Sequence, residues 1–394
     1  MADFFLLSKN KSVFFLTCGM VVFLLCYMLI SVSKIHNAIF YSLVLFPLLF
    51  CAEKKHFVAL HKSKLMNGLL LFLIYSTCTV FWSEFFSLEL LFRTFKRALY
   101  IYGLFLAFHI IIDTFSSFPG RLLQFASLLL SVFSCVCIYL FLTGAGPDPL
   151  RMWGLAALDH PSFYSVIFLA FTMGLAIRYH IEDNQFQPVK SRHVISLFMI
   201  ILAIIVAILC DSRSALVCFL MIVAFYAFIE RKFYWIIMAF VAVALGMFFI
   251  WFTNSSVFIG RTPYRFDIWS VFLDKWKECS YLFGCGMSGW KTTIVQAGGS
   301  IHMHAHSIYV SQLHTGGIVQ LFIYITLLLC FLYEGFLDKE SKPWAIILVA
   351  GMTMTLFDGN KILTTPSPLW IILLIPMSII LSISLKNSKI QPNN

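Results

Sequence analysis

Long apolar runs separated by short polar breaks dominate the chain from one end to the other. About twelve of these runs approach the length of roughly 20 residues that an α-helix needs to cross a bilayer. They lie near 12–33, 37–52, 66–83, 98–116, 121–143, 162–179, 194–210, 213–229, 233–252, 308–335, 343–357 and 366–385. The pattern therefore predicts an all-α polytopic membrane protein with about twelve transmembrane helices.

The longest segment without a spanning run lies between the ninth and tenth predicted helices. We therefore divide the chain into 1–252 with spans one to nine, a large loop at 253–307, and 308–394 with spans ten to twelve and a tail. Six residues of the loop recur at the spacing of an amphipathic surface helix. They are Arg265, Ile268, Trp269, Phe272, Leu273 and Trp276. The glycines of "GCG" at 284–286 then predict a turn.

Composition supports a lipid environment for most of the chain. Hydrophobic residues make up 60% and charged residues 12%, about half of the charged fraction of a soluble domain. No small-residue cleavage site follows the first apolar run, so we expect a retained helix rather than a signal peptide. The net charge of +10 comes largely from short loops between spans. This placement indicates contact with anionic membrane lipids rather than with nucleic acid.

The polar loops divide into two groups that predict the orientation of the chain. Basic segments at 53–64, 178–193, 230–232 and 338–342 share one side with both termini, which short basic loops identify as the cytoplasm. The opposite side holds 93–97, 146–162, 211–215, 253–307 and 358–361. Arginines on that side oppose the usual charge bias, which makes them candidates for function.

Most of the eleven cysteines lie inside apolar runs, where a thiol acts as a small hydrophobic group. Cys279 and Cys285 differ because they lie in the polar outer loop. The sequence leaves both a disulfide and two unpaired thiols open for them.

Arg213 lies in "DSRSA", at a tight break between the seventh and eighth predicted spans. A guanidinium at the edge of the membrane is costly unless it faces a cavity or a partner, so it is a functional candidate. The structural alternative is an arginine that reaches to lipid headgroups or pairs with Asp211.

Three histidines alternate in "HMHAH", at positions 302, 304 and 306. Imidazoles can bind zinc, but no H-E-x-x-H motif or local carboxylate cluster supports a metal site here. A second interpretation is one histidine as a general base with substrate-contacting neighbours. A third is a polar loop rim without chemistry. Beyond them, the glycine pair at 316–317 indicates close approach of a helix or a lipid chain.

The order of these segments resembles the O-antigen ligase and polymerase superfamily of multi-span envelope enzymes. The resemblance rests on "SRSA" at the start of a span, "RFDIW" opening an external helix, "LFGCGMSGW", "HAHSIYVSQLHTGGIVQL" and the closing apolar hairpin. It covers the C-terminal half strongly. The N-terminal half matches only in span count and in "VFWS" at 80–83.

The resemblance implies roles for individual residues. The family's two essential arginines fall on Arg213 and Arg265, and its essential histidine falls on His306. The family usually has asparagine after that histidine, whereas this chain has Ser307, which can still donate and accept hydrogen bonds. We expect Ser307 and His304 to contact substrate.

The resemblance also implies a GT-C-like, metal-independent glycosyltransferase without a cofactor in a bacterial inner membrane. A glycan on undecaprenyl pyrophosphate would be transferred to a sugar hydroxyl of lipid A–core on the periplasmic side. Arginine would hold the departing pyrophosphate, and histidine would act as the base. Arg93, Lys96 and Arg97 are further candidates for phosphate or acceptor contact.

Two alternatives remain beside the ligase. A polymerase would use the same chemistry with a lipid-linked glycan as acceptor. A flippase or transporter of lipid-linked sugars would place charges or broken helices near the membrane midplane. The charged candidates of this chain lie at span ends, so we favour an enzyme, and among enzymes a ligase.

Overall fold

The computed structural model describes residues 2–148, 151–183, 190–231, 265–288, 295–297, 300–302 and 304–390. Almost all of its regular structure is helical, with one short two-stranded antiparallel sheet between α13 and α14. The elements are α1 (Ala2–Leu29), α2 (Ser33–Ile39), η1 (Phe40–Leu45), α3 (Phe46–Cys51), α4 (Lys54–Lys62), α5 (Lys64–Cys78), α6 (Leu88–Thr114), α7 (Phe118–Leu142), η2 (Ala156–Leu158), α8 (Pro161–Asp183), α9 (Lys190–Leu209), α10 (Arg213–Ile229), α13 (Arg265–Cys279), β1 (Val295–Ala297), β2 (Ser300–His302), α14 (Ile308–Leu337), α15 (Lys342–Phe357), η4 (Trp370–Leu374) and α16 (Ile375–Ile390).

The described helices are those of a membrane protein. Seven are long and apolar enough to cross a bilayer, and α4 with α5 would make an eighth as a pair bent by 88°. Three further predicted spans correspond to apolar helices of 10–17 residues, in α9, α10 and α15. The predicted span at 233–252 lies outside the described residues. The total of twelve spans and the GT-C-like class stay predictions.

Two predicted boundaries were wrong. The third predicted span was drawn to residue 83, but α5 ends at Cys78 and turns follow it. The fourth was drawn from residue 98, which left 93–97 in an outer loop. Instead, α6 begins at Leu88, where the Ser87 hydroxyl caps it by accepting from the Leu90 amide at 3.1 Å. The first turns of α6 are amphipathic, and their basic side chains interrupt the apolar run from which the sequence pattern predicts a span.

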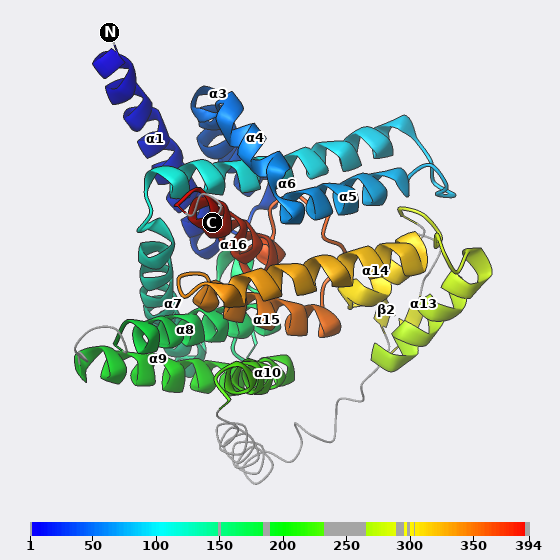
Figure 1. The fold of residues 1–394 in the computed structure, drawn as a ribbon. Helices are drawn as coiled ribbons and strands as arrows, with labels where there is room; N and C mark the ends of the chain where they lie inside the picture. The colour runs from blue at the N-terminus through cyan, green and yellow to red at the C-terminus, as the bar shows by residue number, and fades with distance from the viewer. Residues whose placement is uncertain are drawn as a thin grey trace.

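Several helices run side by side and carry the buried core between them (Figure 1). α8 packs against α9 and α15, α14 against α5 and α15, and α16 against α6. Leu, Ile, Phe and two tryptophans, Trp344 and Trp370, fill the interior. Many large apolar side chains also remain exposed on the outside, which suits a lipid environment better than water.

Ion pairs and loop contacts gather the predicted cytoplasmic segments at one end of the bundle. Lys389 pairs with Asp113 at 2.7 Å, and Lys342 pairs with Glu230 at 3.3 Å. A cavity there is lined by residues of 116–123, 178–182 and 339–344. These contacts bring together the predicted cytoplasmic segments around 178–182, 230 and 338–344 and the C-terminal helix.

At the opposite end, α14 is interrupted at Gly317, whose φ of +68° and ψ of −166° are not helical. Backbone hydrogen bonds place the 280–286 loop in this break. Four backbone bonds join loop and helix: Cys285 N to His314 O at 2.8 Å, Gly286 N to Thr315 O at 2.9 Å, Ile318 N to Tyr281 O at 3.0 Å, and Val319 N to Leu282 O at 3.3 Å. The loop thus replaces the helical bonds that the break removes.

This arrangement explains the two glycine pairs of the sequence. A Cβ at Gly317 would overlap the Leu282 carbonyl, and one at Gly284 would lie 2.6 Å from the Gly317 nitrogen. Both residues also have positive φ, which glycine adopts without strain. Gly317 of the 316–317 pair therefore admits the backbone of the 280–286 loop, rather than a helix or a lipid chain. The turn at 284–286 is held in place by α14.

Candidate functional site

His306 lies in the turn that leads into α14. Its φ of +48° puts it in the left-handed region, which is uncommon for a residue with a side chain. Ser307 follows as the N-cap, and its hydroxyl accepts from the Val310 amide at 3.4 Å. The left-handed turn and the cap together fix the direction in which the His306 ring leaves the backbone. Such strain is typical of functional positions.

A carboxylate faces this ring from the far end of α15. The Oδ1 atom of Asp358 lies 3.6 Å from His306 Nδ1, and the same oxygen accepts from the Gly359 amide at 2.7 Å. Asp358 follows directly after α15, and its side chain is only 10% exposed. A carboxylate beside Nδ1 orients an imidazole and stabilises its protonated form.

His160 approaches the same carboxylate from the residue before α8. Its Nε2 atom lies 3.7 Å from Asp358 Oδ2. Desolvation lowers the pKa of His160 below its ordinary value, with Asp358 acting in the opposite direction and Arg151 adding to the decrease. One carboxylate thus faces two imidazoles from two different loops.

Asp358 remains charged although it is buried. Desolvation alone raises the pKa of this carboxyl group, but the neighbouring ring of His306, the charge of His160 and the Gly359 amide outweigh it and lower the pKa below 3.8. A charged carboxylate at this depth requires such partners, because an isolated one is strongly disfavoured.

Arg265 joins this group as the first residue of α13. Trp269 anchors that helix by donating from Nε1 to the Ala305 carbonyl at 2.8 Å, next to His306. Desolvation lowers the pKa of Arg265, the charge of Asp358 opposes this, and the charge of Arg213 adds to the decrease. The guanidinium still carries its charge at neutral pH. Arg265 thus interacts electrostatically with both Asp358 and Arg213.

Arg213 is the first residue of α10 and lies exposed at the same end of the bundle. Asp211, two residues earlier, has a φ of +46°, and Ser212 caps the helix by accepting from the Ala215 amide at 3.3 Å. Arg151 supports this turn by donating from Nε to the Cys210 carbonyl at 2.6 Å. This turn resembles the one at His306, because a left-handed residue and a serine cap again precede the helix. Here the candidate Arg213 is the first residue of that helix.

We call Arg213, Arg265, His160, His306 and Asp358 the His–Arg cluster. Its members come from the starts of α8, α10, α13 and α14 and the end of α15. Two permanent positive charges, one buried carboxylate and two imidazoles can hold an anion and accept a proton at one place. That combination suits a reaction that transfers a proton while a phosphate-type group departs.

Of the other residues predicted to contact substrate, His304 and Ser307 lie next to His306. The His304 ring lies 4.0 Å from that of His306, centroid to centroid. His302 belongs to β2, and its side chain lies outside what the structure describes. Ser307 is buried and caps α14, so its hydroxyl already has a structural use.

The basic residues of α6 form a group of their own. Arg93 pairs with Glu89 one helical turn earlier, and Lys96 lies 5.7 Å from the centre of the Tyr100 ring. The Nε of Arg97 is buried, and it has no hydrogen-bond partner among the described residues. The contacts described for these three do not join them to the His–Arg cluster.

Residue spacing did not identify Asp358, His160 or Arg151 as site residues. They appear in the outward segments "DGNK" and "GPDPLRMWGLAALDHPS", but far from His306 in the chain. The available signal for Asp358 was a charged residue directly after an apolar run. Over the described residues, no group of three or more His, Cys, Asp or Glu side chains is arranged to hold a metal ion.

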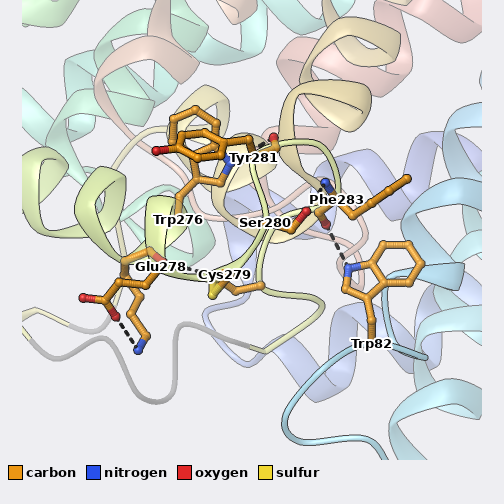
Figure 2. The surroundings of a disulfide bond; sticks show 9 residues. Trp82, Trp276, Glu278, Cys279, Ser280, Tyr281 and Phe283 are labelled. Atoms are coloured by element: carbon orange, nitrogen blue, oxygen red, sulfur yellow. Dashed lines mark hydrogen bonds and ion pairs between the residues drawn. A yellow bond between two sulfur atoms is a disulfide. The ribbon is translucent and has the colours of Figure 1, made fainter.

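Cys279 and Cys285 form a disulfide, which the sequence had left open. Cys279 at the end of α13 bonds to Cys285 in the 280–286 loop (Figure 2). The bond ties α13, which carries Arg265, to the loop that enters the break in α14. Disulfides persist in oxidising compartments, so this end of the bundle suits the outer side of a membrane.

No family model matches the chain, and the search of curated proteins found no match.

Proposed function

We propose that this protein is a membrane glycosyltransferase of the O-antigen ligase type. It transfers O-antigen from undecaprenyl pyrophosphate to a sugar hydroxyl of lipid A–core, on the periplasmic side of the inner membrane. The observation that carries the proposal is the His–Arg cluster, in which two arginines and a carboxylate-oriented histidine meet at one end of an apolar bundle. Motif order adds the sugar chemistry, which the cluster alone does not specify.

In the proposed reaction, the acceptor hydroxyl oxygen attacks the anomeric carbon of the donor glycan. A new C–O bond forms as the bond from that carbon to the pyrophosphate oxygen breaks, and the electron pair leaves with the pyrophosphate. His306 takes the hydroxyl proton on Nε2, because Nδ1 faces Asp358. Arg213 and Arg265 stabilise the leaving group with paired, permanently charged donors.

His160 has a supporting part in this proposal. It approaches the second oxygen of Asp358, at 3.7 Å, while His306 faces the first, so its electrostatic attraction helps to position the carboxylate. Fixing the Asp358 carboxylate fixes the His306 ring, which a general base requires. His304, beside His306, is assigned to substrate contact. We assign no metal or cofactor to the reaction.

The lipopolysaccharide banding pattern of a strain that lacks the protein tests the proposal. A ligase defect removes the whole O-antigen ladder while lipid-linked polymer accumulates. A polymerase defect instead leaves one repeat unit on core. That outcome would identify the protein as a polymerase, which uses the same chemistry with a lipid-linked glycan as acceptor. An unchanged pattern would reject both enzymes.

Orientation is tested separately by labelling from outside. Asp267→Cys on α13 and Lys339→Cys near the opposite end of the bundle make a matched pair. With a membrane-impermeant maleimide on spheroplasts, we expect labelling of Asp267→Cys only, over the background of the unmodified chain. Labelling of Lys339→Cys alone would reverse the orientation and reject a periplasmic site.

A further inference from the structure

A cavity of about 680 Å³ lies at the other end of α13 from Arg265. It is bounded by the 79–87 loop on one side and by the end of α13 with the 280–286 loop on the other. Lys275 on its wall is ten positions after Arg265, which places it about 15 Å along the helix. The cavity is thus separate from the His–Arg cluster but reached along the same outer helix.

The walls of this cavity are held rigidly. The disulfide between Cys279 and Cys285 forms part of its lining, and the 280–286 loop is bonded into the break of α14. Across the cavity, Trp82 Nε1 donates to the Phe283 carbonyl at 2.8 Å (Figure 2). The Met287 amide donates to the Thr79 carbonyl at 3.1 Å. A site with fixed walls loses little entropy when it binds a ligand.

Two aromatic residues, Trp82 and Phe283, line this cavity. Trp82 and Phe283 lie edge to face at 6.1 Å between centroids, yet they remain 37% and 50% exposed. The bond to the Phe283 carbonyl fixes the indole plane, so the ring is presented in one orientation. Flat, exposed aromatic faces suit the apolar C–H face of a pyranose ring.

Polar groups lie around these rings. Glu84, Lys275 and Ser280 line the same cavity and supply a carboxylate, an ammonium group and a hydroxyl. Lys275 is also paired with Glu278 at 3.0 Å, which holds the ammonium group in position. Sugar hydroxyls need donors and acceptors of this kind around an aromatic platform. The volume falls within the range of roughly 300–1,000 Å³ of small-molecule sites.

We propose that this cavity binds a sugar unit of the oligosaccharide acceptor, at a distance from the reacting hydroxyl. The inference rests on the proposed glycosyl transfer and adds a binding subsite to it. Contacts made far from the reaction can position an acceptor whose reacting end lies at the His–Arg cluster. The aromatic pair then determines acceptor affinity, while the cluster determines turnover.

Binding is measured on the purified full chain in lipid nanodiscs. The probe is core oligosaccharide released from lipopolysaccharide by mild acid, and the readout is calorimetric titration. We expect Trp82→Ala to raise Kd at least about ten-fold, as for loss of an aromatic anchor. Glu84→Ala, which changes only an exposed side chain, should raise Kd several-fold without changing the melting temperature.

Phe86→Ala is the matched control, because Phe86 is a 49% exposed aromatic residue of the same loop that does not line the cavity. Its Kd should equal that of the unmodified chain. Equal losses in Trp82→Ala and Phe86→Ala would overturn the subsite and indicate a general membrane-interface role. Absence of binding to the unmodified chain, or unchanged Kd in both Trp82→Ala and Glu84→Ala, would also overturn it.

Failure of the proposed function would look different. His306→Ala should bind the oligosaccharide with unchanged Kd, although it is expected to lose transfer. If His306→Ala retains transfer while Trp82→Ala loses binding, the reaction mechanism is wrong and the sugar subsite stands. In transfer assays, Trp82→Ala should raise KM for the acceptor and leave kcat nearly unchanged.

Discussion

The carboxylate of Asp358 lies 3.6 Å from Nδ1 of His306, although the two residues precede and follow different helices. The left-handed turn at His306 and the turn at Gly359, whose φ is +94°, bring them together. Gly359 packs against Ile308, where even a Cβ would be only 2.9 Å from the isoleucine side chain. The pairing is thus built into the contact between the start of α14 and the end of α15.

Replacement of Asp358 by asparagine should therefore impair the reaction more than the fold. The amide keeps the shape but neither orients nor stabilises a protonated His306, so we expect transfer to fall about 10²-fold or more. Purified protein, donor and acceptor in detergent give the measurement. Asp274→Asn, on the exposed face of α13, serves as control. Full activity in Asp358→Asn would show that the carboxylate takes no part in the reaction.

The same substitution changes how stability depends on pH. The pKa of folded Asp358 lies below 3.8, so the folded state binds this proton less readily than the unfolded chain. The ionised Asp358 carboxylate therefore stabilises the folded state at pH values above its ordinary pKa of 3.8. This stabilisation is lost as the pH falls through the lower pKa of the folded state. Between about pH 6 and pH 3, the melting temperature of the unmodified chain should fall further than that of Asp358→Asn. Parallel curves would contradict this assignment.

The arginines are tested by keeping their charge and changing their shape. Arg213→Lys and Arg265→Lys lose the planar fork that holds a phosphate with two bonds, so each should lose much of its activity. Arg121→Lys, at the start of α7, is the control and should transfer normally. Normal transfer in Arg213→Ala and Arg265→Ala, inserted at normal levels, would exclude them from leaving-group stabilisation.

Among the described residues, the sequence predicted most of the long apolar helices, because lipid imposes a length and a composition on each of them. It also predicted α13 from the spacing of Arg265, Trp269 and Phe272, since one face of a surface helix must be apolar. It failed at α6, where charged residues lie within the first turns. Local charge is a poor guide when a long helix extends beyond the membrane.

Long-range partners were beyond the reach of the sequence pattern. The interlock of the 280–286 loop with the break at Gly317 depends on two backbones that meet far apart in the chain. The glycines at 284–286 signalled a turn and the pair at 316–317 a close approach, but neither pattern identified the other segment as its partner. Asp358 and His160 were likewise visible as polar outer residues, and only the fold brings them to His306.

The interlock predicts a large difference between two glycine substitutions. Gly317→Ala places a methyl group on the Leu282 carbonyl and should prevent stable insertion of the 280–286 loop. Gly144→Ala has a similar φ, +71° against +68°, but nothing lies within 4 Å of its Cβ. It should cost only the backbone strain of roughly 1 kcal/mol. Comparable melting temperatures for the two variants would argue against the interlock.

Loss of the disulfide should weaken the same region. Cys279 and Cys285 are six positions apart, and closing so short a loop stabilises the folded state by about 2 kcal/mol in the chain-entropy view. We expect Cys279→Ser, and the unmodified chain under reductant, to melt at lower temperature. Cys330→Ser, an exposed free thiol in α14, should not change the melting temperature. Equal melting of all forms would show that the bond adds no stability.

The three alternating histidines should differ sharply when each is replaced by alanine. His306 is fixed by its left-handed turn and faces Asp358, so His306→Ala should lose transfer by about 10²-fold or more. His304, which packs against His306, should give an intermediate loss, and His302 in β2 a mild one. The zinc hypothesis predicts comparable losses in all three variants and inhibition by chelators. Transfer by the purified variants, with and without EDTA, decides between them. Full activity of His306→Ala would exclude the general base, and EDTA inhibition reversed by zinc would support a metal site instead.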